Sequence, residues 1–211
     1  SPIHTFSIGL PNSPDLHYAK IMANHIGSIH HEVLVDEKEM LSILPKVVYS
    51  TETYDVTTIR ASVPMFLLAK YIRENTPIKV IFSGEGSDEL SGSYMYFHNY
   101  PSLKDFDKEC VRLLKDLCYF DCLRCDKSTA AWGLEVRCPF LDKEFVDYYM
   151  TIPTEWKIPQ KGVEKWFLRK CVDRDNLLPN EILWRKKEAF SDGVSSTKKS
   201  WYEILEEYCS S

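Results

Sequence analysis

The pattern of hydrophobic and polar positions alternates between strand-like and helix-like periods from residue 4 to residue 82. Short apolar runs rich in β-branched residues predict strands over 4–10, 30–35 and 79–82. Helical spacing of apolar residues predicts helices over 14–26, 37–50 and 61–75. Strands that alternate with helices predict parallel βαβ units, which bind ligands at the carboxyl ends of their strands.

Capping residues support these helix boundaries. Ser13 is a predicted N-cap, and Gly27 is a predicted stop for the same helix. Asp36 and Glu39 have the spacing of a capping box for the next helix. Pro45 lies inside that second helix, so we expect a kink or a break there.

The pattern becomes helical after the glycine-rich segment that follows residue 82. Ser102 and Asp105 form a predicted capping box for a long helix that we expect to run to about Asp126. Further helices are predicted over 143–152, 163–174 and 200–208. Because no strand signal of comparable strength returns, the sequence predicts an α/β layer followed by a helical C-terminal half.

Composition narrows the class of protein. A chain of 211 residues with 44% hydrophobic and 27% charged residues is typical of one globular domain. A net charge of -5 argues against general nucleic-acid binding, which needs a basic field. The chain contains no run of about 18 apolar residues that would predict a membrane span, and no charged-then-apolar leader opens it. We therefore expect neither nucleic acid nor a membrane as a partner.

The seven cysteines have an irregular spacing that does not indicate a disulfide framework. Cys118, Cys122 and Cys125 have helical i, i+4, i+7 spacing within the predicted long helix. Cysteines with this spacing are typical of one of three arrangements: a thiolate metal site, a redox pair, or a stripe of small apolar residues in the core. Because no fourth ligand lies nearby in the sequence, we interpret them as core residues of a protein in a reducing compartment.

The segment VIFSGEGSDELSG, residues 80–92, carries the most specific local chemistry. A glycine loop between a strand and a helix start typically holds an anion on backbone N–H groups. Its spacing matches neither GxGxxG nor a Walker loop, and it carries three carboxylates, Glu85, Asp88 and Glu89, without a basic residue. Either a divalent cation such as Mg²⁺ bridges them to a polyphosphate, or one of them transfers protons, or they only favour a solvated helix start.

Four longer motifs set the loop in context: TETYDVTTIRAS, VIFSGEGSDEL, WGLEVRCPFLD and LWRKKEAFSDG. In this order they resemble the synthetase domain of glutamine-dependent asparagine synthetases, and the resemblance covers essentially the whole chain. It implies an α/β fold with a parallel sheet of the ATP-pyrophosphatase, or adenine nucleotide alpha hydrolase-like, type. It also implies that ATP and Mg²⁺ activate aspartate to β-aspartyl-AMP. Ammonia, released from glutamine in a separate N-terminal domain, would then convert this intermediate to asparagine.

The resemblance assigns roles to residues at the strand ends and in the loop. Ile8 would pack on adenine, and Ser83 and Gly84 would contact ATP. Asp88 would hold Mg²⁺ on the pyrophosphate side. Glu85 would be required for adenylate formation and is the candidate base for the incoming ammonia.

The same resemblance brings basic residues to the site. Arg60 would lie near the ammonia route and the acyl-adenylate, and its position near a helix start, where the dipole disfavours a cation, also favours a ligand role. Lys187 would stabilise charge on the phosphates, whereas we interpret Lys186 as solvated. Three residues are expected near the site in lesser roles: Glu89, Asp121 and Arg124.

The sequence differs from the family pattern at two motif positions, and it lacks segments that the family pattern contains. Ser93 replaces the usual Gly before Tyr94, and Cys138 replaces the usual Val. The chain shows no SGGxDSS pyrophosphate loop, no glutaminase domain and no final segment. We therefore interpret residues 1–211 as a fragment of the synthetase domain that is inactive alone.

Two alternatives stay open. A related acyl-adenylating enzyme, such as a β-lactam synthetase, is expected to carry Tyr in place of Glu85, so Glu85 favours ammonia chemistry. A non-catalytic nucleotide-binding fragment would keep the fold without the reaction. We expect a cytosolic location. The sequence does not decide whether the protein is a homodimer.

Overall fold

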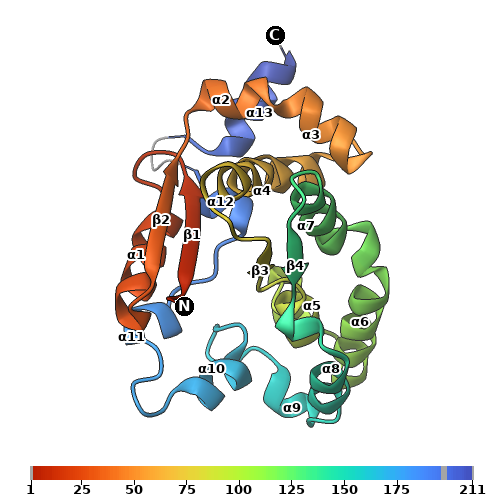
Figure 1. Ribbon diagram of the computed structural model, residues 1–211. Helices are drawn as coiled ribbons and strands as arrows, with labels where there is room; N and C mark the ends of the chain where they lie inside the picture. The colour runs from red at the N-terminus through yellow and green to blue at the C-terminus, as the bar shows by residue number, and fades with distance from the viewer. Residues whose placement is uncertain (1, 196–198, 211) are drawn as a thin grey trace. The chain divides into compact units, whose positions relative to one another are not determined.

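The computed structural model describes residues 2–195 and 199–210. The chain forms two compact units, whose elements are labelled in Figure 1. Unit 1 comprises Ser1–Lys79, Arg124–Glu135 and Glu188–Ser211, and unit 2 comprises Val80–Leu123 and Val136–Lys187. Each unit therefore combines segments that are far apart in the sequence.

Unit 1 contains a two-stranded parallel sheet with a helix between its strands. β1 (His4–Gly9) and β2 (Ile29–Leu34) pair in register along their whole lengths. α1 (Pro14–Ile26) connects the two strands (Figure 1). One of the predicted parallel βαβ units is confirmed, whereas the third predicted strand, over 79–82, belongs to a different sheet.

The predicted caps lie where the helices begin and end. Gly27 follows α1 with a left-handed φ of 66°, a conformation that glycine adopts at little cost. Asp36 accepts a hydrogen bond of 2.8 Å from the N–H three residues later, at the start of α2 (Glu37–Ser42). A new helix, α3 (Leu44–Thr51), starts beside Pro45. The predicted stop and break are therefore confirmed, and Asp36 makes its half of the predicted capping box. Ser13 stands at the N-cap position of α1 as predicted, but its side chain makes no capping hydrogen bond.

The next helix, α4 (Val56–Asn75), begins earlier than the predicted start at Ala61. The reason is a second cap, because the Asp55 carboxylate accepts a hydrogen bond of 2.7 Å from the Thr58 N–H. α4 packs against β1, and its Phe66 side chain is fully buried in the core of unit 1.

The last two helices of the chain return to unit 1. α12 (Phe190–Gly193) and α13 (Trp201–Ser210) both pack on α4. Trp201 is fully buried in the same core as Phe66. The predicted separation of a helical C-terminal half is wrong at this point, because apolar residues of α13 complete the core of the α/β unit.

Unit 2 starts from a short strand pair. β3 (Val80–Phe82) pairs with β4 (Glu135–Arg137), and the Ser83 N–H donates to the Arg137 carbonyl at 2.9 Å. β4 was not predicted, because three residues are too few to display an alternating pattern. The remaining elements of unit 2 are α5 (Ser87–Ser91), η1 (Met95–Asn99), α6 (Leu103–Asp116), η2 (Leu117–Tyr119), η3 (Pro139–Leu141), α8 (Lys143–Met150), α9 (Thr154–Lys157), α10 (Trp166–Val172) and α11 (Asn180–Leu183). α7 (Asp121–Ala130) begins in unit 2 and belongs to unit 1 from Arg124 on.

The predicted long helix is interrupted. Ser102 caps α6 as predicted, but the chain leaves the helical conformation at Phe120, with φ -128° and ψ -104°. No Gly or Pro marks this break in the sequence, so the local pattern did not reveal it. The predicted cysteine stripe is wrong as a consequence, because Cys118 is exposed in η2 whereas Cys125 is buried in α7.

The helices and strands together confirm the predicted α/β class. The ATP-pyrophosphatase type of the sheet stays a prediction. Among the described residues, no helix combines the length and the apolar character needed to cross a membrane.

Candidate active site

The glycine loop after β3 is shaped by two glycines with left-handed backbones. Gly86 has φ 86°, and a Cβ at this position would overlap the side chain of Leu141. Gly92 has φ 58°, and a Cβ there would overlap the ring of Phe106. Gly84 differs from both, because no atom lies within 4 Å of the position its Cβ would take. Gly86 and Gly92 are therefore required by the fold, whereas Gly84 faces open space.

Asp88 is the centre of a charge cluster in unit 2. Its Oδ1 lies 2.9 Å from Lys165 Nζ and 3.3 Å from Lys187 Nζ. The Ser93 hydroxyl donates a hydrogen bond to the same oxygen. Burial by itself raises the pKa of Asp88, but the two ammonium groups and the hydroxyl outweigh it and lower the pKa to about 2.

Lys187 is directed into the loop. Its Nζ donates to the Ser93 carbonyl at 3.0 Å and lies 4.6 Å from the centre of the Tyr94 ring. The neighbouring Lys186 is exposed. The structure therefore brings Lys187, and not Lys186, to Asp88.

Two further carboxylates lie around the Tyr94 hydroxyl. The hydroxyl donates to Glu89 Oε1 and lies 3.2 Å from Asp121 Oδ2. Glu89 is only 3% exposed. Burial first, and then the adjacent Asp121, raise the pKa of Glu89 to about 7. Glu89 is thus a carboxyl group that gains or loses its proton near neutral pH.

Glu85 lies near the Cys122 thiol, on which Glu89 also acts. It is half-buried in the loop. Burial raises the pKa of the Cys122 thiol to about 12, and the charges of Cys138, Glu85 and Glu89 raise it in the same direction. Two of the loop carboxylates therefore have opposite surroundings: Asp88 faces ammonium groups, whereas Glu89 lies beside Asp121.

Three of the predicted site residues belong to unit 1. Ile8 is 2% exposed and is part of the hydrophobic core, which favours a core role over an adenine contact. Arg60 Nη1 lies 3.6 Å from Asp192 Oδ1, and its Nε is buried without a hydrogen-bond partner among the described residues. Arg124 lies on α7.

Lys165 was missed by the sequence reasoning. It contacts Asp88, and its Nζ also donates to the Ser87 hydroxyl at 2.9 Å. Lys165 is the N-cap of α10 and has a left-handed φ of 54°. A cation at a helix start is unfavourable for the dipole, so the argument applied to Arg60 would also have drawn attention to Lys165.

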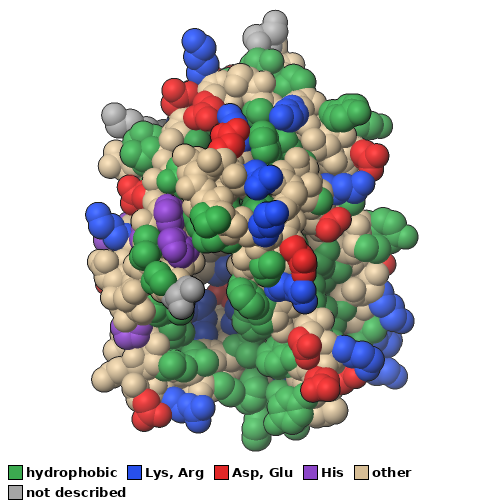
Figure 2. Space-filling view, in the orientation of Figure 1, with side chains coloured by type: hydrophobic (Ala, Val, Ile, Leu, Met, Phe, Trp, Pro, Cys, Tyr) green, Lys and Arg blue, Asp and Glu red, His purple; other side chains and the backbone are tan. Residues whose placement is uncertain are grey.

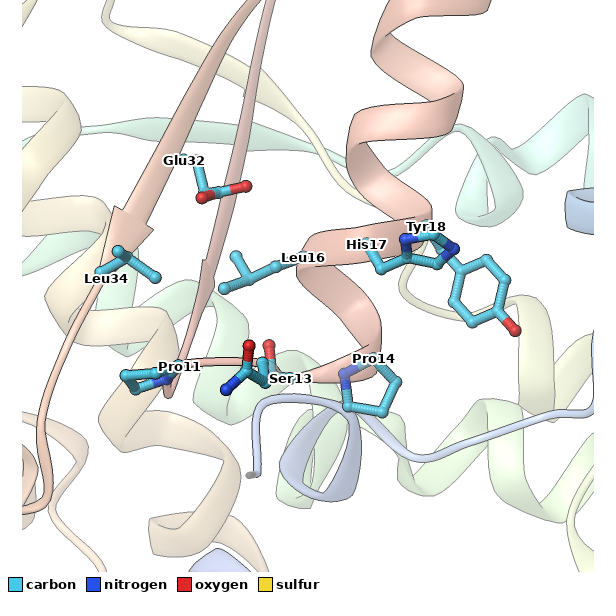
Figure 3. Close-up of a pocket in the computed structure, with 9 residues that line it drawn as sticks. Pro11, Ser13, Pro14, Leu16, His17, Tyr18, Glu32 and Leu34 are labelled. Carbon is cyan, nitrogen blue, oxygen red and sulfur yellow. The ribbon is translucent and has the colours of Figure 1, made fainter. Parts of the chain in front are cut away.

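Unit 1 has an open cavity of about 600 Å³ at the start of α1. Figure 3 shows its walls, to which α1 contributes Pro14, His17 and Tyr18 and β2 contributes Glu32 and Leu34. None of the predicted site residues lines this cavity. Its lining residues all belong to unit 1.

Carboxylates and lysines gathered after a strand and a glycine loop are typical of α/β enzymes that act on phosphorylated ligands. Comparison with known sequences identifies the family to which the chain belongs. The chain belongs to the asparagine synthase family, whose sequence model matches residues 1–106 and 99–211.

Three individual relatives share one protein name. The chain is similar to the glutamine-hydrolysing asparagine synthetases of Cricetulus griseus at 56% identity, and of Homo sapiens and Gallus gallus at 55% identity. Each comparison covers 207 residues, which are 98% of this chain and 37% of the relative. The chain thus spans 37% of the length of the curated relatives that it matches.

Proposed function

We propose that the protein containing this chain makes asparagine from aspartate with ATP, through β-aspartyl-AMP that ammonia from glutamine attacks. The observation that carries this proposal is the convergence of Lys165 and Lys187 on Asp88 beside an open glycine loop. The identity with glutamine-hydrolysing asparagine synthetases over 98% of the chain supports it. The proposed sheet type is that of the ATP-pyrophosphatases, and the proposed location is the cytosol, with a homodimer left open.

The charge balance at Asp88 suits a polyphosphate. Two ammonium groups face one carboxylate, so the cluster has one positive charge in excess. Lys187 and Lys165 would move onto phosphate oxygens and stabilise the charge that develops there when the adenylate forms. Ser83 and the open position of Gly84 would contact the nucleotide.

Asp88 also fits the proposed Mg²⁺. No group of three His, Cys, Asp or Glu side chains in the described part of the chain is arranged to hold a metal ion. Mg²⁺ in nucleotide enzymes typically uses one or two carboxylates and completes its shell with phosphate oxygens and water. Asp88 is ionised throughout the physiological range because its pKa is about 2. It would therefore hold Mg²⁺ against the pyrophosphate, and the ion would supply further charge neutralisation.

The acidic side of the loop suits the second half-reaction. Ammonia that attacks the adenylate must lose a proton, and a carboxylate within reach accepts it. Glu85 is proposed as this base. Glu89, held with Asp121 around the Tyr94 hydroxyl, would orient the substrate or the loop. By the family resemblance, Arg60 is proposed to act near the acyl-adenylate, and Asp121 and Arg124 are proposed in lesser roles.

The test is the Glu85→Ala variant of the full-length protein. Asparagine formation from aspartate, MgATP and either glutamine or ammonium should fall by about 10² to 10⁴, while glutamine hydrolysis stays near its normal rate. Glu144→Ala, which removes an exposed carboxylate on α8, is the matched control and should retain synthesis. Near-normal synthesis by Glu85→Ala would reject the role of Glu85. Lack of asparagine and pyrophosphate from the unaltered protein would reject the proposed function itself.

A further inference from the structure

Unit 2 has a second cavity, with a volume of about 620 Å³, next to the charge cluster. Small-molecule sites in proteins typically have volumes of about 300–1,000 Å³. The lining is mainly apolar, with side chains from η3, α8, α10 and α11. Five aromatic residues contribute to it: Phe140, Phe145, Tyr148, Tyr149 and Phe167.

The polar groups of this cavity are basic or neutral. Among the described residues that line it, two are cationic, Lys165 and Arg169, and none is Asp or Glu. Arg169 is fixed in the wall, because its Nε donates to the Glu164 carbonyl at 2.9 Å and its Nη1 donates to the Leu183 carbonyl. Lys165 Nζ, at the end of a flexible side chain, reaches the Ser87 hydroxyl and lies 2.9 Å from Asp88 Oδ1. Because Lys187 also faces Asp88, this cluster keeps one positive charge in excess beside the cavity.

The aromatic walls are incompletely covered. Tyr148 is 70% exposed, and Figure 2 shows hydrophobic side chains gathered at the surface over α9. Trp156 of α9 is 58% exposed, and its ring lies 5.9 Å from that of Phe167 in the cavity wall. Exposed apolar surface of this kind typically marks a site of interaction.

We propose that this cavity binds a small amphipathic organic anion, with an aromatic body between the rings and an acidic group on Lys165. The apolar lining disfavours a polyphosphate, whereas the two cations without a lining acid disfavour a cationic ligand. Rings at the mouth favour a flat aromatic body, which they contact face to face or edge to face. This inference depends on contacts within unit 2 and shares Lys165 with the proposed function. Tyr148 and Cys171 line the cavity without belonging to the Asp88 cluster, so their readouts can fail while the synthetase reaction stands.

A pair of fluorescent probes tests both parts of the proposal in the full-length protein. 8-Anilinonaphthalene-1-sulfonate carries an aromatic body and a sulfonate, and N-phenyl-1-naphthylamine has the same body without the charge. Tyr148→Ala should weaken both probes by about threefold to tenfold, as loss of an aromatic contact does. Lys165→Met should weaken only the sulfonate probe, by about tenfold.

Two matched variants control for general effects. Tyr119→Ala removes a tyrosine that is also 70% exposed but does not line the cavity. Lys161→Met removes an exposed lysine outside the lining. Both variants should bind the probes like the unaltered protein, and thermal unfolding curves should show that all four variants are folded.

Cys171 provides a second readout that does not depend on fluorescence. This cysteine lines the cavity and is exposed, so the sulfonate probe should slow its alkylation by N-ethylmaleimide. Alkylation of Cys209, an exposed cysteine of unit 1, should not change. The proposal is overturned if the full-length protein shows no saturable probe binding, including the case in which another segment of its chain fills the cavity. Equal effects of Lys165→Met on both probes, or an unprotected Cys171, would also overturn it.

Discussion

Lys187 Nζ lies 3.3 Å from Asp88 Oδ1, although the two residues stand at opposite ends of unit 2 in the sequence. The same nitrogen donates to the carbonyl of Ser93 at 3.0 Å. Because Ser93 also donates to Asp88, one lysine, one carboxylate and one serine form a closed set of contacts around the glycine loop. Ser93 replaces the glycine expected from the family, and its hydroxyl is one of the groups that hold Asp88.

The first prediction concerns Lys187. Lys187→Ala in the full-length protein should lower pyrophosphate release under saturating MgATP and aspartate by about 10² or more, as loss of a preorganised charge does. Lys187→Arg should not fully restore the rate, because a planar fork and a point charge meet phosphate differently. Lys186→Ala is the matched control and should change little, since Lys186 is exposed. Comparable losses for both alanine variants would mean that the basic run acts only through its summed field.

The second prediction separates a structural glycine from a functional one. Gly86→Ala should lower the free energy of unfolding by about 1–3 kcal/mol, because it combines a left-handed backbone with a clash against Leu141. Gly84→Ala should change stability by less than about 0.5 kcal/mol, since nothing lies near its Cβ position. If the nucleotide approaches the backbone of Gly84, the Gly84→Ala variant should instead raise the KM for MgATP by about tenfold. Urea unfolding and steady-state kinetics of the two variants measure these effects, and an unchanged KM would argue against nucleotide contact at Gly84.

The third prediction is a pH dependence at Glu89. Its pKa is raised from 4.5 to about 7 in the folded protein, so the folded state binds the extra proton between these values. The contribution of Glu89 to stability is therefore complete below about pH 4.5 and is lost as pH rises through 7. Glu89→Gln mimics the protonated form and should raise the free energy of unfolding at pH 8, with little difference at pH 5.

The measurement for Glu89 is urea unfolding of both proteins at these two pH values. Tyr94 can still donate to the carboxamide oxygen of the variant, so the main hydrogen bond is kept. Destabilisation of equal size at pH 5 and pH 8 would show that the proton on Glu89 is not the cause. Asparagine formation by the variant should fall despite the higher stability, because the proposed site loses an acidic group.

The fourth prediction concerns an ion pair in unit 2 whose lysine is buried and whose carboxylate is partly exposed. Lys157 is 1% exposed and its Nζ lies 2.9 Å from Asp107 Oδ1. Asp107→Ala leaves a buried ammonium group without its carboxylate and should cost about 3 kcal/mol of stability. Lys157→Met removes the buried charge and should cost less than about 1 kcal/mol, because an apolar side chain of similar volume replaces it. Thermal unfolding of the full-length variants measures both changes.

A surface pair gives the control for this comparison. Lys143 and Asp147 are paired on α8, with side chains 87% and 63% exposed. Asp147→Ala should therefore cost no more than about 0.5 kcal/mol. A similar cost for Asp107→Ala and Asp147→Ala would contradict the prediction that burial of Lys157 makes its partner important.

The sequence by itself determined the local elements and the motifs. Asp36, Ser102 and Gly27 act on backbone groups within a few residues of themselves, so their signals are complete in the local sequence. The same is true of the parallel βαβ unit, whose pattern needs only alternating periods. The residues of the glycine loop and Lys187 were also found from motifs, because each motif is a short contiguous segment.

Tertiary structure decided which of these residues meet. The approach of Lys165 to Asp88 depends on how α10 packs, and no residue near either of them in the sequence encodes it. The return of Trp201 to the core of unit 1 likewise depends on burial among distant segments, and no Gly or Pro in the local sequence accounts for the break at Phe120. Local signals arise from hydrogen bonds between near neighbours in the chain, whereas these contacts arise from apolar burial and charge pairing, which the order of residues along the chain does not display.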